Sequence, residues 1–230
     1  EANVVNLARE KREEGYSVRI LGEGSNGGNI TYPSSVRDPL ATIFAIIKLL
    51  AIRDSLEHDG TIRPGLFHLW CIKSGQENKY KPDFTLSDIL ASLPAYTTTG
   101  VSESRAVLHV KTEDKGKLKL RFQKLFEQEW KERRDELKEK YGIESYAADT
   151  TNGTKEIKNA TDWNNGNGGL KIRFMDSSGT NKAFIWMRPS GTESVFRVMC
   201  DTKGIKPQEE HSLLEWETSI LMRADAIGKQ

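Results

Sequence analysis

The second half of the chain alternates polar and apolar residues, and this pattern restricts the fold more than any other feature. Residues 170–174 read Leu-Lys-Ile-Arg-Phe and residues 195–199 read Val-Phe-Arg-Val-Met. A period of two predicts β-strands with one buried face. Amphipathic helices are predicted before and after them, over 117–141 and 207–226. We also expect strands over 107–110, 170–175, 183–187 and 194–200, and an Asn/Gly-rich loop over 150–169. This order predicts an α+β layered domain with its helices on one face of the sheet.

The first half predicts a mixture of helices and strands. Asp38 before Pro39 is a strong helix start. The helix that follows, to about Leu56, has an apolar stripe broad enough for the helix to be largely buried. We expect strands over 16–21 and 66–72, and a short helix that a capping box opens at 85–88. A Thr/Ser/Gly-rich stretch then marks a boundary. The predicted organisation is an α/β domain over 1–96, a linker over 97–104 and an α+β domain over 105–230.

The charge balance excludes some partners. The chain has 34 Lys and Arg against 33 Asp and Glu, a net charge of +1, which gives no field to attract nucleic acid or an anionic membrane. Any phosphate site must therefore be local. No apolar run is long enough for a membrane span. Two cysteines are too few for a disulfide scaffold, so we expect a reducing, cytoplasmic setting. Because no Met begins the chain, we expect a fragment or a processed product.

The glycine-rich segment over 22–27, Gly-Glu-Gly-Ser-Asn-Gly, allows several interpretations. It matches the dinucleotide-binding pattern, but Pro33 and the lack of a helical period after it argue against that site. A kinase is excluded as well, because no His-Arg-Asp or Asp-Phe-Gly run follows. A polyol site remains: Glu23 accepts from vicinal hydroxyls, and Ser25 both donates and accepts. A plain tight turn with a surface Glu23 is the alternative.

A second loop, Arg188-Pro-Ser-Gly-Thr-Glu193, lies between two predicted strands and suits an anion. Arg188 carries a planar, permanent charge, and Ser190 and Thr192 offer hydroxyl donors. Gly191 lets successive N–H groups converge, and Arg197 adds a second cation nearby. The alternative is a hairpin turn in which Arg188 pairs with Glu193. We favour a phosphate site.

Together, Gly-Glu-x-Ser-x-Gly, an Asp at a helix start and the distant Arg-Pro-Ser-Gly-Thr-Glu resemble the C-terminal part of the α-D-phosphohexomutases, the phosphoglucomutases and phosphomannomutases. The resemblance implies that residues 1–96 form all or part of the family's third domain, which is α/β. It also implies a fourth domain over 105–230, α+β and TATA-box-binding-protein-like. Glu23 and Ser25 would bind the sugar of a hexose phosphate. The phosphate that is not transferred would be held by Arg188, Ser190, Gly191, Thr192 and Arg197.

The same resemblance implies what this chain lacks. In the family a phosphorylated serine and a Mg²⁺ loop of aspartates belong to the first two domains. We find no Ser-His-Asn run and no Asp-Gly-Asp-x-Asp run here. We therefore expect no catalytic residue and no metal ligand in this chain, with Mg²⁺ bound by the N-terminal domains of the same enzyme. An isomerase as a whole, inactive as this part alone, is the expectation. The alternative is a non-catalytic sugar-phosphate-binding or scaffolding module.

Overall fold

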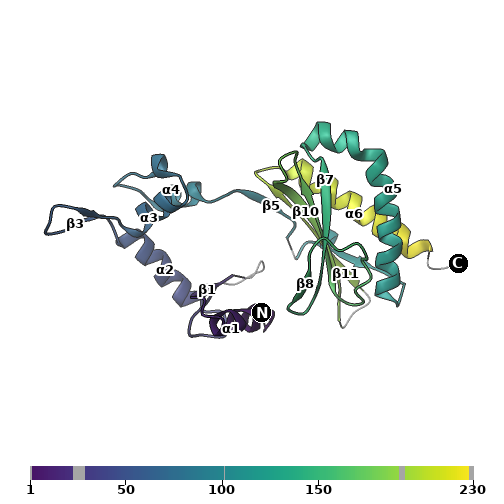
Figure 1. Cartoon of the computed structure of the whole chain (residues 1–230), viewed down its shortest axis with the longest axis horizontal. Helices are drawn as coiled ribbons and strands as arrows, with labels where there is room; N and C mark the ends of the chain where they lie inside the picture. The colour runs from purple at the N-terminus through teal and green to yellow at the C-terminus, as the bar shows by residue number, and fades with distance from the viewer. Residues whose placement is uncertain (1, 23–28, 101, 192–194, 228–230) are drawn as a thin grey trace. The chain divides into compact units, whose positions relative to one another are not determined.

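The computed structural model describes residues 2–22, 29–100, 102–191 and 195–227. The chain divides into two compact units between Pro94 and Ala95, coloured from purple to blue and from teal to yellow in Figure 1. The first unit contains α1 (Ala2–Glu13), β1 (Ile20–Leu21), β2 (Ile30–Thr31), α2 (Pro39–Ala51), β3 (Ser55–Leu56), β4 (Ile62–Arg63), α3 (Leu66–Lys73), the 3₁₀ turn η1 (Glu77–Lys79) and α4 (Leu86–Ser92). The second contains β5 (Tyr96–Thr98), η2 (Ser104–Ala106), β6 (Val107–His109), α5 (Lys115–Tyr141), β7 (Ser145–Asn152), β8 (Lys155–Ile157), β9 (Gly169–Met175), β10 (Asn181–Pro189), β11 (Val195–Lys203) and α6 (Pro207–Ile227).

Side-chain caps start the predicted helices of the first unit. Asp38 accepts a hydrogen bond from the Ala41 N–H at 3.1 Å and begins α2. Asp88 accepts one from the Thr85 N–H at 2.7 Å, which completes the predicted capping box of α4. Each carboxylate satisfies an N–H that has no partner within its helix. Both helix starts are thus confirmed.

Three predictions for the first unit are wrong. The strand expected over 66–72 is the helix α3, because Phe67 and Cys71, four residues apart, both turn into a small core. A short apolar run does not distinguish a buried helix from a strand. The strand over 16–21 is reduced to Ile20–Leu21, paired with β2. The helix α2 ends at Ala51 rather than near Leu56, and none of its residues is buried.

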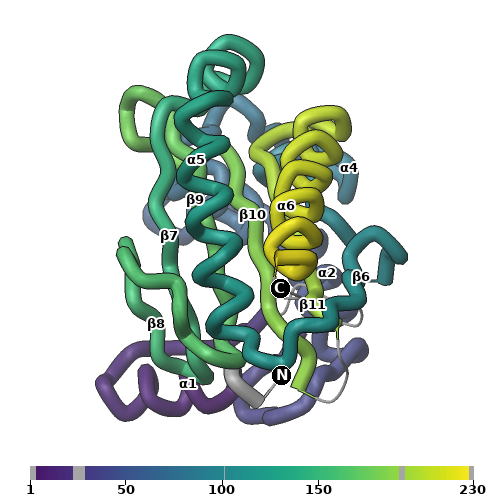
Figure 2. Tube along the Cα trace, turned by 90° about the vertical axis from the view of Figure 1, so that its right-hand side faces the viewer, coloured from purple at the N-terminus to yellow at the C-terminus, as the bar shows by residue number. Residues whose placement is uncertain are grey.

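The second unit is an antiparallel sheet covered on one face by α5 and α6, which lie side by side (Figures 1 and 2). In the described residues the sheet has seven strands, in the order β5-β11-β10-β9-β7-β8, and β6 pairs with β11 beside β5. Asp114 caps α5 by accepting from the Lys117 N–H at 2.9 Å, and Gly142 ends it with a positive φ of 66°. The α+β architecture predicted for this half is confirmed, as are both of its helices.

The core of the second unit lies between the two helices and the inner face of the sheet. On β10 the residues Ala183, Ile185 and Met187 are buried, so the residues between them face away from the helices. On α5 the side chains of Phe122 and Phe126 are fully buried beneath the sheet. The alternation that the sequence shows is therefore the alternation between the core and an open face.

Two segments of the second unit differ from expectation. The Asn/Gly-rich loop expected over 150–169 begins within β7, which pairs with β9. It also contains β8, which pairs with β7. The small and polar residues of β7 show no alternation of polar and apolar side chains, so the sequence did not predict this strand. The linker expected over 97–104 instead begins within β5, which pairs with β11, and Thr99 is buried. Its hydroxyl group donates to the carboxylate of Glu210 in α6.

Candidate functional site

The candidate phosphate loop connects the two central strands of the sheet. β10 ends at Pro189 and β11 begins at Val195. The Ser190 N–H donates to the Val195 carbonyl at 2.9 Å and closes the base of the hairpin. Gly191 is exposed, and nothing lies within 4 Å of the position that a side chain would occupy there. The loop base is thus fixed by the sheet, while the Gly191 backbone is open to an incoming group.

Two arginines stand directly opposite each other at the base of this loop. Arg188 on β10 and Arg197 on β11 are Cα partners in the antiparallel register, and both are exposed. Among the described residues, neither makes an ion pair with a carboxylate. Like charges directly across two strands repel each other, so this pair lowers the stability of the sheet until an anion neutralises it. The arrangement can therefore bind a dianion between two guanidinium groups.

The predicted ligands divide between the described residues and the segments outside them. Glu23 and Ser25, the predicted sugar ligands, lie outside the described residues, and so do Thr192 and Glu193. Of the predicted phosphate ligands, the structure brings Arg188, Ser190, Gly191 and Arg197 to one hairpin.

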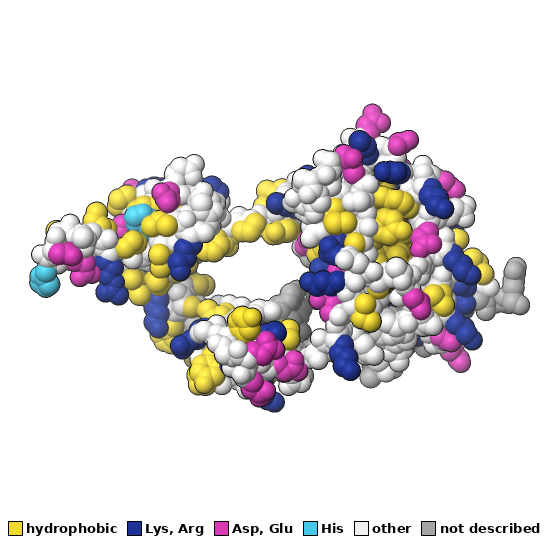
Figure 3. All heavy atoms as spheres, viewed as in Figure 1, with side chains coloured by type: hydrophobic (Ala, Val, Ile, Leu, Met, Phe, Trp, Pro, Cys, Tyr) yellow, Lys and Arg dark blue, Asp and Glu magenta, His cyan; other side chains and the backbone are white. Residues whose placement is uncertain are grey.

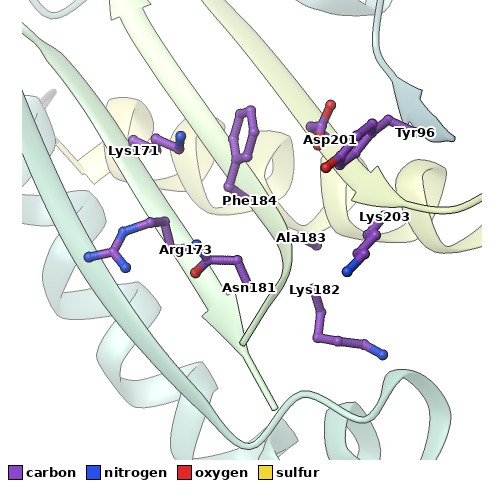
Figure 4. Close-up of a pocket in the computed structure, with 9 residues that line it drawn as sticks. All are labelled: Tyr96, Lys171, Arg173, Asn181, Lys182, Ala183, Phe184, Asp201 and Lys203. Atoms are coloured by element: carbon purple, nitrogen blue, oxygen red, sulfur yellow. The ribbon is translucent and has the colours of Figure 1, made fainter. Parts of the chain in front are cut away.

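A shallow pocket of about 210 Å³ lies on the same sheet, farther from the loop (Figure 4). It was not among the predicted sites. Lys171 lies beside Phe184, and Lys182 and Lys203 lie near each other on the other side of the pocket. The Lys171 ammonium group lies 4.1 Å from the centre of the Phe184 ring. Every second residue of β10 from Lys182 to Arg188 is basic or aromatic, but the lysines of β9 and β11 join this surface only through the register of the sheet.

Of the six acidic and basic side chains that are buried in the described second unit, two have no exposed surface. Lys119 of α5 is fully buried, and its ammonium group donates to the Gly168 carbonyl at 2.8 Å and to the Asn165 side chain. Burial lowers the pKa of Lys119 to about 8. Glu217 of α6 is also fully buried, neither of its carboxylate oxygens has a hydrogen-bond partner among the described residues, and burial raises its pKa well above the ordinary value. Because both groups are buried away from solvent, we expect them to affect the stability of the fold rather than to take part in a reaction.

A polar cluster lies at the start of α3 in the first unit. The Nδ1 atom of His68 lies 2.9 Å from Asp54, and the His68 ring stacks on Tyr80 with the ring centres 3.9 Å apart. Asp54 also accepts from the Gly65 N–H at 2.7 Å, at the start of α3. These contacts fix α3 against the preceding turn. They explain the cluster without a ligand.

No metal centre can be assembled from the described residues. Among them, no group of three or more His, Cys, Asp or Glu side chains could hold a metal ion. The described residues therefore offer no ligand set for the Mg²⁺ that the resemblance implies for the whole enzyme. In the described part of the chain, no helix combines the length and the apolar composition that a membrane span requires.

Comparison with known proteins adds no assignment. No protein-family model matches the chain, and no curated protein or solved structure matches it. The functional inference therefore rests on the residues and their geometry.

Proposed function

We propose that this chain is the substrate-binding C-terminal half of a phosphohexomutase, an isomerase that moves a phosphoryl group between two hydroxyls of a hexose phosphate such as glucose or mannose phosphate. The observation that carries the proposal is the pair of exposed arginines, Arg188 and Arg197, that face each other across two strands beside Ser190 and Gly191. The two sequence motifs and the α+β architecture support it. The finer fold assignments, a third-domain-like unit and a TATA-box-binding-protein-like unit, belong to the same proposal.

In this mechanism the chain positions the substrate. The Arg188 guanidinium group donates two parallel hydrogen bonds to the phosphate that is not transferred, and Arg197 neutralises its second charge. Ser190 and Thr192 donate hydroxyl hydrogen bonds, and the Gly191 backbone approaches closely. Glu23 and Ser25 hold the sugar hydroxyls in either orientation of the sugar. Such positioning supplies on the order of several kcal/mol of the barrier reduction in phosphoryl transfer.

The proposed partners are a hexose phosphate and the N-terminal domains of the same enzyme. The phosphoserine donor and the Mg²⁺ ligands belong to N-terminal domains that this sequence does not include, and the enzyme works in the cytoplasm. A non-catalytic sugar-phosphate-binding or scaffolding module is the second candidate, favoured by the absence of a Ser-His-Asn run and of an aspartate-rich run in this sequence.

Calorimetric titration with glucose 6-phosphate and mannose 6-phosphate tests the binding site. Arg188→Ala should weaken binding about ten- to a hundred-fold, because hydrogen bonds to charged groups contribute about 1.5–3 kcal/mol. Lys131→Ala, an exposed charge on α5, is the matched control and should change nothing. Equal losses in the two variants would remove the loop from the site.

An activity assay separates the two candidates. The chain alone with Mg²⁺ should show no mutase turnover. Adding separately produced N-terminal domains that carry a phosphoserine should restore turnover if the chain is half of a mutase. Binding of sugar phosphate without restored turnover would favour the non-catalytic module.

A further inference from the structure

The sheet of the second unit has an open face that the proposed function uses only at one end. α5 and α6 cover the other face, and the residues that alternate with the buried ones project away from them. On β10, the central strand, these outward residues are Lys182, Phe184, Trp186 and Arg188. Two aromatic side chains with a basic one at each end therefore form one row, from the pocket in Figure 4 to the phosphate loop.

The neighbouring strands add positive charge to this face. β9 contributes Lys171 and Arg173, and β11 contributes Arg197 and Lys203, at outward positions opposite the β10 row. With Lys182 and Arg188, these residues make six basic side chains on β9–β11.

Three carboxylates on the described strands lie on the same face, and each has a partner. Glu156 on β8 is the register partner of Thr151 and lies 3.8 Å from the Lys158 ammonium group. Asp149 on β7 pairs with Arg173 at 2.6 Å, and Asp201 on β11 accepts the Thr98 hydroxyl at 2.5 Å. Within the described residues, Lys171, Lys182 and Lys203 form no ion pair. The net charge of +1 for the whole chain thus conceals a locally basic surface.

The aromatic side chains on this face form a platform at the level of the sheet. Phe184 lies beneath the Lys171 ammonium group, so its ring already takes part in a cation–π contact. The Trp186 indole nitrogen lies close to Gly169 on β9, only 3.2 Å from the position that a Cβ atom would occupy there. Gly169 therefore leaves room for the indole to lie against the backbone. Tyr96 on β5 is 54% exposed at the edge of the pocket.

We propose that this open face binds single-stranded nucleic acid, with bases stacked on Phe184 and Trp186 and phosphates held by the surrounding lysines and arginines. Proteins bind single-stranded nucleic acid by stacking its unpaired bases on aromatic side chains while basic side chains contact its phosphates. The row from Lys182 to Arg188 extends about 20 Å at the rise of a β-strand. That length suits several consecutive nucleotides better than one small anion.

Fluorescence anisotropy with a labelled twelve-nucleotide oligothymidine tests the proposal. The chain should bind the single strand more tightly than a duplex of the same length. If about four phosphates are contacted, the logarithm of the binding constant should fall with the logarithm of the salt concentration with a slope near −3. Phe184→Leu, which keeps an apolar side chain but loses the ring, should weaken binding about ten-fold.

Charge variants separate this face from general electrostatics. Lys203→Gln should lower the magnitude of the salt slope by about one, because one phosphate contact is lost. Lys131→Gln removes the same charge from the exposed face of α5 and should leave both the affinity and the slope unchanged. Thermal melts of the variants verify that each is folded, and Lys171→Gln serves as a second variant on the same face.

The outcomes distinguish the possible ligands. Thymidine monophosphate binding as tightly as the twelve-mer would show a mononucleotide pocket and overturn the single-strand proposal. Equal losses in Lys203→Gln and Lys131→Gln, or affinity that does not change with length, would overturn it as well. Neither Phe184 nor Lys203 belongs to the phosphate loop, so hexose phosphate titrations of these variants report on the mutase proposal separately.

Discussion

The two units of this chain use apolar residues in different ways. In the second unit, α5, α6 and the inner face of the sheet enclose a continuous core. In the first, the buried cluster consists of Phe67, Cys71, Phe84 and Ile89, while hydrophobic side chains remain on its surface in Figure 3. Apolar residues form a core only when two layers face each other. The comparison shows that apolar content alone does not indicate how much of a unit is buried.

Helix α2 illustrates the difference most clearly. Its residues Leu40, Ile43 and Phe44 are 66%, 52% and 60% exposed. A helix that is hydrophobic on nearly all sides is normally interior. In the described first unit, α2 packs through Leu49 and Leu50, at its C-terminal end, against the small cluster that contains Phe67. The strands β1 to β4 are each two residues long and do not extend into a layer.

The largest effect should come from breaking the core of the second unit. Phe126 is fully buried and its ring lies among those of Trp163, Tyr146 and Trp216. Phe126→Ala should lower the free energy of unfolding of this unit by about 3–5 kcal/mol, because it removes a large side chain and leaves a cavity. Urea denaturation followed by tryptophan fluorescence measures the change.

A matched variant in the first unit sharpens this test. Phe67 is also fully buried, but within the small cluster. Phe67→Ala should leave the urea midpoint of the second unit unchanged and shift only the signal of the first. If both variants moved a single transition by the same amount, the two units would unfold as one and the comparison would fail.

A pH-dependent contribution of about 3 kcal/mol should come from Lys119. Its pKa is lowered to about 8 in the folded chain, against 10.5 for the free side chain, and each unit of difference corresponds to about 1.36 kcal/mol. Below pH 8 both states are protonated and the folded state bears the full cost. Between pH 8 and 10.5 the unfolded state binds more protons, so stability rises with pH.

Replacing the lysine isolates this contribution from other alkaline titrations. The difference in unfolding free energy between the wild type and Lys119→Met should change by about 3 kcal/mol from pH 8 to 10.5. Lys131→Met, on the exposed side of the same helix, should show no such change. A constant difference for Lys119→Met across this range would mean that Lys119 has an ordinary pKa.

The sequence predicts most of the second unit because its signals are local. Its helices and the strands after residue 168 follow from periodicity. In the first unit, Asp38, Thr85 and Asp88 mark helix starts by their own hydrogen bonds. It misses β7, because Ala147, Ala148 and Asp149 gain their strand conformation from pairing with β9. The helix α3 is missed because a buried apolar run has the same appearance in both conformations.

The candidate site shows the same division. The loop residues Arg188 to Gly191 are predictable from their chemistry, since anion donors lie close together in the sequence. The open face is not, because Lys171, Phe184 and Lys203 come from three strands and meet only through the register. The near-neutral net charge is a property of the sum, and it says nothing about which face of a sheet each charge occupies.

The smallest effect should come from the exposed face of α2. Phe44→Ser replaces a 60% exposed ring with a residue of similar helix propensity. The free energy of unfolding of the first unit should change by less than about 0.5 kcal/mol, as for other surface substitutions. Urea denaturation followed by circular dichroism, with Phe67→Ala as the buried counterpart, measures it. A loss of about 2 kcal/mol or more would show that α2 is covered in solution, and that the contrast between the two units is smaller than the exposed fractions indicate.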